Sequence, residues 1–195
     1  SPPPARLGTL SLMLTVRECT RTDVVPLGAL ALDALLEAPS STQELDEVPN
    51  SPLYLGEEIA QGREEALRPI VAELSGELAG FAAFERRSMA RSHHVIEVLL
   101  LVHPQARGQG VGRRLLEATE RRFQADAGVG KLVMIVAADD QPLQALISRA
   151  PDWVREQRCP RAWARGARRV DVESWANLAV GSQEADRREA GGIDG

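Results

Sequence analysis

The chain has 195 residues, of which 44% are hydrophobic and 26% are charged, and its formal net charge at pH 7 is −5. This length suits a single domain with a sizeable core. The acidic balance argues against binding to a nucleic-acid backbone or to an anionic membrane surface, and no apolar run approaches the length that crosses a bilayer. Residues 1–20 lack a basic segment followed by an apolar one, so we expect a cytoplasmic protein.

The first half of the chain predicts a loose arm, one strand and two helices. The arm is rich in proline, the strand is apolar, and Thr or Asp stands where a helix needs an N-cap. In chain order the predicted segments are the flexible arm 1–9, the strand 12–17, a helix capped by Thr22 or Asp23 and running to Glu37, the linker 39–42, and a helix over 53–67.

The second half predicts strands on both sides of two further helices. Ser75-Gly76 suits a tight hairpin turn between the predicted strands 70–74 and 78–84. A strand, a crossover helix and a strand that is apolar throughout indicate a right-handed unit with two parallel strands, 94–102 and 132–137. The other predicted segments are the strands 70–74 and 78–84, a helix capped by Asp139 or Asp140 with Pro142 in its first turn, a hairpin of strands 153–165 and 169–176 that turns at Gly166, and a disordered tail over 181–195.

A glycine-rich turn over residues 107–112 separates the apolar strand from the crossover helix, which ends near residue 128. Residues without a Cβ let several backbone N–H groups converge, and the start of a helix adds its positive dipole, so the turn predicts a diphosphate site. The dinucleotide fingerprint would need glycine at position 113, which is Arg113. The Walker motif would need Gly-Lys followed by Ser or Thr, whereas Lys131 is followed by leucine.

The pattern R-x-x-G-x-G, preceded by Val-His-Pro and followed by Arg-Arg-Leu-Leu, resembles motif A of the GNAT superfamily of acetyl-CoA-dependent N-acetyltransferases. The order of the predicted elements is similar to that of the same family. The resemblance implies an α+β fold over residues 10–180, with a mixed, mostly antiparallel sheet, splayed parallel fourth and fifth strands, and about four flanking helices. One departure is Asp152-Trp153, which stands where the family often has Gly-Phe at the start of the sixth strand.

The resemblance also implies a site for acetyl-CoA as co-substrate. The turn holds the diphosphate through its N–H groups, and backbone groups at the end of the fourth strand pair with the pantetheine arm. No metal is expected, because the three histidines, Cys19 and Cys159 lack a suitable spacing. The expected cofactor-binding residues are Leu101, Val102, Arg107, Gly108, Gln109, Gly110, Val111, Gly112, Arg113 and Asp140.

Glu97 is the expected general base. It is the one carboxylate in an otherwise apolar strand, close to where many members of the family place a catalytic glutamate. The alternative is an ion pair with Arg86 or Arg87. His93 and His94 open the same strand, where a solvated strand end explains them as well as catalysis does.

The family often protonates the leaving thiolate with a tyrosine of the fourth helix, and this chain departs from that pattern. The position is Ile147 or Ser148, depending on the alignment, and the single tyrosine is Tyr54. Ser148 is therefore a weak candidate acid, with ordered water as the alternative.

The sequence thus predicts an N-acetyltransferase that moves an acetyl group from acetyl-CoA directly to a primary amine of a small molecule or peptide. The alternatives are a non-catalytic acyl-CoA-binding module and, less well supported, a nucleotide-binding regulator. We expect a monomer or homodimer without nucleic-acid or membrane partners. Acidic residues near the first two helices favour a cationic acceptor, although an ordinary solvated face explains them equally well: Glu44, Asp46, Glu47, Glu57 and Glu58.

Overall fold

The computed structural model describes residues 13–37, 51–61, 67–124, 126–165 and 167–180. The expected arm 1–9, the linker 39–42, the tail 181–195 and the acidic residues Glu44, Asp46 and Glu47 lie outside these ranges. Among the helices within them, none combines the length and the apolar composition that crossing a bilayer requires.

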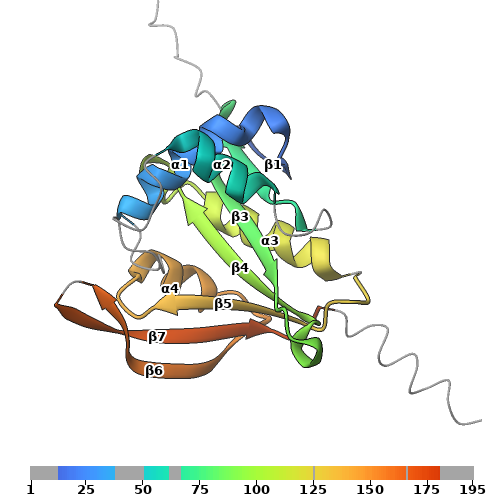
Figure 1. Cartoon of the computed structure of the whole chain (residues 1–195), viewed down its shortest axis with the longest axis vertical. Coiled ribbons are helices and arrows are strands. Elements are labelled where there is room, and N and C mark those ends of the chain that lie inside the picture. The colour runs from blue at the N-terminus through green and yellow to red at the C-terminus, as the bar shows by residue number, and fades with distance from the viewer. Residues whose placement is uncertain (1–12, 38–50, 62–66, 125, 166, 181–195) are drawn as a thin grey trace, which may run out of the picture.

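The elements of the described residues follow one another in the predicted order (Figure 1). They are β1 (Leu14–Glu18), α1 (Val24–Glu37), α2 (Pro52–Gln61), β2 (Ile70–Leu74), β3 (Glu77–Arg86), β4 (Val95–Val102), α3 (Val111–Gln124), β5 (Lys131–Ala137), α4 (Gln141–Ile147), β6 (Trp153–Arg165) and β7 (Arg168–Asn177).

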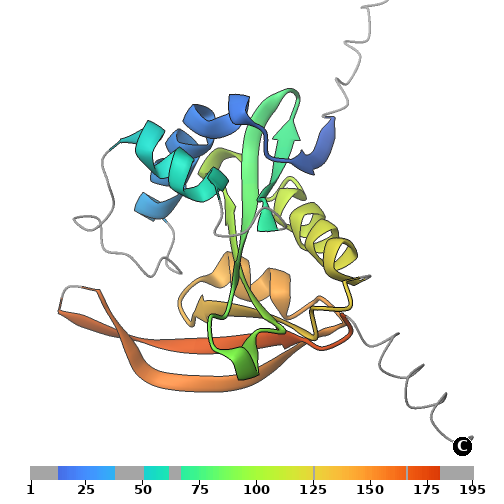
Figure 2. The same cartoon turned by 45° about the vertical axis from the view of Figure 1, so that its right-hand side comes forward.

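The strands form one sheet in the order β1-β2-β3-β4-β5-β7-β6. Every neighbouring pair is antiparallel except β4 and β5, which run parallel on either side of the crossover helix α3. The mixed sheet and its parallel central pair are therefore confirmed. The long β6–β7 hairpin forms the far edge of the sheet and extends past the end of α4 (Figure 2).

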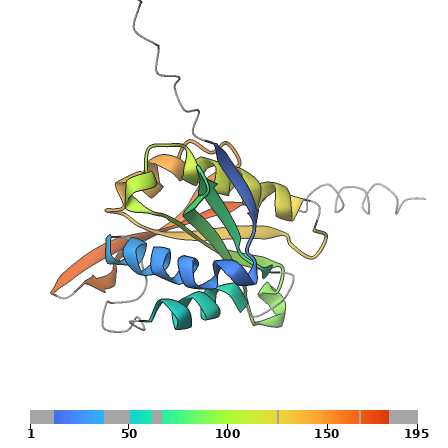
Figure 3. The same cartoon turned by 90° about the horizontal axis from the view of Figure 1, so that it is seen from above.

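Helices cover both faces of this sheet (Figure 3). Helices α1 and α2 pack on one face, where Leu27, Leu30 and Leu55 meet Phe81 and Leu101. Helices α3 and α4 lie on the other face over a larger core. The α3 residues that contribute to this larger core, Val111, Leu115, Leu116 and Phe123, have the spacing of one apolar stripe.

Strands β4 and β5 pair over a short stretch and then separate (Figure 1). The parallel register joins Val95, Ile96 and Glu97 to Lys131, Leu132 and Val133. On its other edge β5 pairs with β7 from Leu132 to Ala137, whereas residues 98–102 of β4 have no described strand on the β5 side. The predicted splay of the two parallel strands is thus confirmed, and it begins directly after Glu97.

The hairpin between β2 and β3 turns at Ser75 and Gly76, as predicted. Their φ angles are +55° and +90°, both in the left-handed region, and such a pair of positive angles matches the twist of the flanking strands. Glycine meets this requirement without strain, whereas serine at a positive φ is unusual. The turn therefore sets the pairing of β2 with β3 at this end of the hairpin, where Leu74 is opposite Glu77.

Helices α1 and α2 approach until their backbones touch. A Cβ built on Gly28 would lie 1.7 Å from the Pro52 carbonyl oxygen, and one built on Gly56 would lie 1.8 Å from the Val24 carbonyl oxygen. Neither glycine has room for a side chain, so this pair sets the distance between the two helices.

Two expectations about the first half of the chain were wrong in detail. The first helical segment begins with a short 3-10 turn, Arg21–Asp23, and its N-cap is Thr20 rather than Thr22 or Asp23. The Asp23 carboxylate instead turns back and accepts hydrogen bonds of 2.7 Å from the Thr20 N–H and hydroxyl. The predicted helix over 53–67 ends at Gln61 in the described residues, and Leu67 lies outside the helix in the core beside β2.

Candidate functional site

The glycine-rich turn before α3 leaves backbone N–H groups without acceptors inside the helix. Gly108 and Gly110 have φ angles of +76° and +83°, and a Cβ added to either would meet no other atom within 4 Å. Their role is therefore conformational rather than steric. The first hydrogen bond of α3 runs from the Arg114 N–H to the Gly110 carbonyl at 3.1 Å. The N–H groups of residues 111–113 precede this bond at the positive end of the helix, an arrangement that binds phosphate groups.

Gly112 keeps open the space beside this helix start. A Cβ built on it would lie 3.2 Å from Leu146 Cδ2 of α4 and 3.5 Å from Val102 Cγ2 of β4. A larger side chain at this position would therefore project into the space between the strand and the two helices. Glycine here leaves room for a ligand to reach the N–H groups of the turn.

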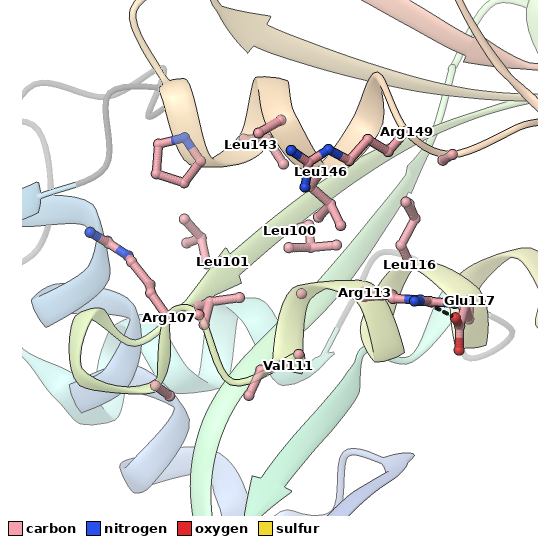
Figure 4. Close-up of a pocket in the computed structure, with 18 of the residues that line it drawn as sticks. Leu100, Leu101, Arg107, Val111, Arg113, Leu116, Glu117, Leu143, Leu146 and Arg149 are labelled. Atoms are coloured by element: carbon pink, nitrogen blue, oxygen red, sulfur yellow. Dashed lines mark hydrogen bonds and ion pairs between the residues drawn. The ribbon is translucent and has the colours of Figure 1, made fainter.

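A cavity of about 610 Å³ lies between α3, α4 and the end of β4 (Figure 4). Its volume is typical of small-molecule sites. The predicted cofactor-binding residues line it with the exception of Gln109, whose side-chain amide donates to the Gln105 carbonyl at 2.9 Å. The residues in question are Leu101, Val102, Arg107, Gly108, Gly110, Val111, Gly112, Arg113 and Asp140.

Asp140 fixes the opposite wall of the cavity as the N-cap of α4. Its Oδ1 accepts a hydrogen bond of 3.1 Å from the Leu143 N–H, so the prediction of a cap at Asp139 or Asp140 is confirmed for Asp140. Pro142 occupies the first turn, where a helix needs no N–H donor. With α4 held in this orientation, Leu143 and Leu146 turn toward β4 and line the cavity (Figure 4).

Basic side chains stand at both ends of the cavity. Arg107 lies at one end, and Arg113 and Arg149 lie at the other, on α3 and just after α4 (Figure 4). The Arg113 Nε–H donates to Glu117 Oε1 at 2.8 Å and holds the pKa of that carboxyl below its usual value. The guanidinium groups and the N–H groups of the turn together favour an anionic ligand.

Glu97 belongs to the opposite face of the sheet and does not line the cavity. Side chains alternate along a strand, so Glu97 shares its face of β4 with Leu99 and Leu101, on the side of α1 and α2. The Arg87 Nε–H donates to Glu97 Oε1 at 2.7 Å. The expected alternative of an ion pair is confirmed for Arg87, while Arg86 donates to the His93 carbonyl instead.

Neither alignment of the missing tyrosine leads into the cavity. Ile147 is fully buried in the core between the sheet and the α3–α4 layer. Ser148 is the exposed C-cap residue of α4 and does not line the cavity. Tyr54 lies on the exposed side of α2, with 56% of its surface accessible.

Other residues line the cavity that were not predicted to do so, among them Glu120 of α3 and Leu143 and Leu146 of α4. The two leucines follow the capping aspartate at helical spacing, a signal that is visible in the sequence once Asp140 is taken as the N-cap. Glu120 has a different signal, since it continues the stripe of Gly112 and Leu116 along α3 at intervals of four residues.

The chain matches the sequence profile of the acetyltransferase (GNAT) family over residues 32–150. It belongs to that family and has the GNAT fold, as the turn and the order of its elements predict. The chain is therefore an acyltransferase of the GNAT N-acetyltransferase class.

Relatives of known structure share the whole fold. The structure of yncA from Salmonella typhimurium, solved with its cofactor acetyl-CoA, is 20% identical with a TM-score of 0.74 and covers 85% of this chain and 94% of its own. A GNAT superfamily phosphinothricin acetyltransferase from Sinorhizobium meliloti, in complex with acetyl-CoA, is 18% identical with a TM-score of 0.71 and covers 84% of this chain and 87% of its own. Acetyl-CoA is thus bound by members of this family that share the fold.

A relative of higher identity matches a smaller part of the chain. The L-amino acid N-acyltransferase MnaT of Escherichia coli (strain K12) is 34% identical over 73 residues, which is 37% of this chain and 41% of MnaT. The chain therefore aligns with less than half of the length of that relative.

Proposed function

We propose that this acetyltransferase transfers an acetyl group from acetyl-CoA directly to a primary amine, with the cavity as the acetyl-CoA site and the face of Glu97 as the acceptor side. The observation that supports this most strongly is the gap between β4 and β5. It opens directly after Glu97, and the cavity lies at its other end against residues 100–102. A ligand that enters from the α3–α4 side thus approaches the one carboxylate of β4.

The residues of the cavity and the edge of β4 suit the diphosphate and the pantetheine arm of acetyl-CoA. The N–H groups of residues 111–113, together with Arg107, offer donors and positive charge to the diphosphate. The free backbone edge of β4 beyond Glu97 offers hydrogen bonds to the amide groups of the pantetheine arm, as an added strand would. Bound acetyl-CoA supplies the acetyl group as a thioester.

The chain contributes to transfer by holding protons and charge. In our proposal a backbone N–H of β4 donates to the thioester carbonyl and stabilises the charge that develops there. Glu97 accepts the proton of the attacking amine as the new C–N bond forms and the C–S bond breaks. No described side chain at the cavity is a phenol or an imidazole, so the departing thiolate takes its proton from water. Compared with the sequence prediction, Ser148 has lost support as the acid.

The acceptor is proposed as the amine of a small molecule, with an L-amino acid as the first candidate. The name of MnaT supports this choice. The Arg87–Glu97 pair supports it as well, because the guanidinium offers a positive charge to the carboxylate of an amino acid and Glu97 offers a negative charge to its amine. The cationic acceptor expected from the sequence stays a second candidate, carried by the exposed Glu57 and Glu58 of α2. Such small acceptors are consistent with a cytoplasmic enzyme.

The non-catalytic acyl-CoA-binding module is the second candidate function. The observation in its favour is that Arg87 already occupies the carboxylate of Glu97, and that neither Ile147 nor Ser148 supplies an acid to the cavity. Such a module would keep the phosphate-binding turn and the cavity while lacking turnover.

Two measurements on the purified chain separate these functions. Thermal shift with CoA tests the cavity, and release of free thiol from acetyl-CoA over a panel of L-amino acids, polyamines and peptide amines tests transfer. We expect a higher melting temperature with CoA and thiol release above the solvent background with at least one amine. CoA binding without thiol release for any amine would favour the module, and no CoA binding would overturn both functions.

A further inference from the structure

Leu99 is an exposed leucine in the middle of the sheet. Strand β4 has β3 on one side and β5 on the other, and yet 40% of Leu99 is accessible to water. Leu101 lies two residues further on the same face and is only 6% exposed, because it packs with Phe81 and with α1. Leu99 belongs to neither core cluster of the described residues. The layer of α1 and α2 therefore covers Leu101 and leaves Leu99 open.

Apolar side chains adjoin Leu99 on both neighbouring strands. Ala83 of β3 is its partner in the antiparallel register. Ile135 of β5 follows Val133, the partner of Glu97, by two residues and so shares the face of Glu97 and Leu99. Ala83 and Ile135 are both partly exposed. Ala83, Leu99 and Ile135, here called the apolar strip, thus cross the sheet at the level where β4 and β5 separate.

Charged side chains lie directly beside the apolar strip on the same face. Glu97 precedes Leu99 by two residues, a distance of about 7 Å along a strand. Glu85 is the partner of Glu97 in the register of β3 and β4, and Arg87 donates to Glu97 Oε1 at 2.7 Å. Two carboxylates thus accompany one guanidinium, which favours an added ammonium group. Arg87 has further N–H donors for a carboxylate.

We infer that the acceptor is an L-amino acid with a long apolar side chain, and that Leu99 is a specificity-determining residue that this side chain covers. The inference rests on the proposed function, which puts the amine at Glu97 and the acetyl group in the gap. The amine and the carboxylate then lie at Glu97 and Arg87, and the side chain lies on the apolar strip. A cationic side chain would lose hydration there without gaining a partner, and alanine would leave the strip in water.

A series of amino acids tests the strip on the parent enzyme. The series is alanine, 2-aminobutyrate, norvaline and norleucine, which differ by one methylene at each step, and thiol release from acetyl-CoA gives kcat/KM for each. We expect kcat/KM to rise along the series and to be at least about tenfold higher for norleucine than for alanine. Glutamine and arginine are the polar and cationic comparisons of similar reach, and we expect each to fall at least about tenfold below norleucine.

Two variants of Leu99 test the residue itself. We expect Leu99→Ser to lower kcat/KM for norleucine about tenfold and to leave that for alanine within about twofold. Leu99→Glu brings a carboxylate to the strip, and we expect it to reverse the preference between norleucine and arginine. Val154→Ser is the matched control, because Val154 is 51% exposed on the same face but lies on β6, and it should change neither preference. Melting curves establish which variants are folded, and the series on the parent decides if neither Leu99 variant is.

Three results would overturn the inference while leaving the proposed function intact. The parent could use alanine or arginine as well as it uses norleucine. Leu99→Ser could slow all amines alike, which would make the role of Leu99 structural. The same variant could instead change the preference between acetyl-CoA and butyryl-CoA with the preference among amines unchanged, which would assign the strip to the acyl chain. Thiol release with no amine at all would overturn the proposed function, and the inference with it.

Discussion

The Nε–H of Arg87 donates a hydrogen bond of 2.7 Å to Oε1 of Glu97, at the point where β4 leaves β5. Both side chains are about two-fifths exposed, at 41% and 42%, so the pair is open to an incoming acceptor. Such a pair has two roles available to it. It either stabilises the sheet as an ion pair or holds a carboxylate in the orientation of a general base.

Glu97→Gln and Arg87→Gln together decide between these roles. Each variant removes the same ion pair, which at this exposure contributes about 0.5 kcal/mol or less, but only the first removes the proton acceptor. If Glu97 is the base, Glu97→Gln lowers kcat on the order of 100-fold with acetyl-CoA affinity retained, while Arg87→Gln stays active. Equal and small losses of melting temperature with normal turnover in both variants would leave the ion pair as the whole role.

Gly110→Asp and Gly110→Asn test the diphosphate site of the turn. Both side chains impose the same demand at φ +83°, and Asn and Asp tolerate such angles better than other residues do. Only aspartate brings a negative charge to the start of α3. We expect Gly110→Asp to bind CoA about 2 kcal/mol more weakly than Gly110→Asn, a difference of roughly 30-fold. Titration of both folded variants with CoA measures this difference. Equal affinities would mean that the diphosphate does not bind at this turn.

Ser148→Ala tests whether the serine after α4 supplies a proton to the leaving thiolate. Because Ser148 is exposed and does not line the cavity, we expect thiol release to stay within about twofold of the parent rate. A tenfold loss with unchanged CoA affinity would restore Ser148 as the acid.

Ile147→Tyr tests the other alignment of the missing phenol. Ile147 is fully buried, so the larger tyrosine should overpack the core and lower the free energy of unfolding by about 2 kcal/mol without accelerating transfer. Denaturant unfolding and thiol release measure the two effects. A stable and faster variant would show that this position reaches the cavity.

Asp23→Asn tests the clamp that joins β1 to α1. The Asp23 carboxylate accepts hydrogen bonds of 2.7 and 2.8 Å from Arg17, which hold its pKa well below the usual range. As the pH falls, the carboxyl of Asp23 is therefore protonated in the unfolded chain before it is protonated in the folded chain. The clamp thus stabilises the fold at pH values above the ordinary pKa of aspartate, near 4. We expect the variant to lose about 2 kcal/mol at pH 7, since Arg17 is itself partly exposed.

This loss should shrink as the pH falls below about 4, because the parent then loses the same contribution. Urea unfolding of parent and variant at pH 7 and at pH 3 provides the comparison. A difference that is independent of pH would mean that the charge of Asp23 is not what stabilises the parent.

Local patterns were sufficient to predict most of the fold and the phosphate-binding turn. Gly108, Gly110 and the Ser75-Gly76 turn act through their own φ angles, so the sequence alone carries the information. The apolar strand 132–137 likewise indicates a parallel strand covered on both faces. These features depend on neighbours within a few residues.

Contacts between distant elements account for what the sequence did not predict. Trp153 meets Glu120 across 33 positions, and the donor to Glu97 is Arg87 rather than Arg86 because of the register between β3 and β4. Which residues of α4 face the cavity depends on how that short helix packs on the sheet. A rotation of the helix about its axis by the angle between two successive residues would bring different side chains into the cavity. The cap at Thr20 depends on Arg17, which holds Asp23 from the preceding strand.

The short pairing of β4 with β5 means that the sheet consists of two smaller sheets joined along a narrow seam. Among the described strands, β1–β4 lie on one side of it and β5–β7 on the other, and the three residue pairs that begin at Val95 connect them. Each half can therefore tilt against the other about this seam at a low cost in backbone hydrogen bonds. A ligand lying in the gap would contact both halves and oppose that movement. Amide hydrogen exchange along the β5-facing edge of residues 98–102 should accordingly slow when CoA binds, even where CoA does not cover the exchanging amide.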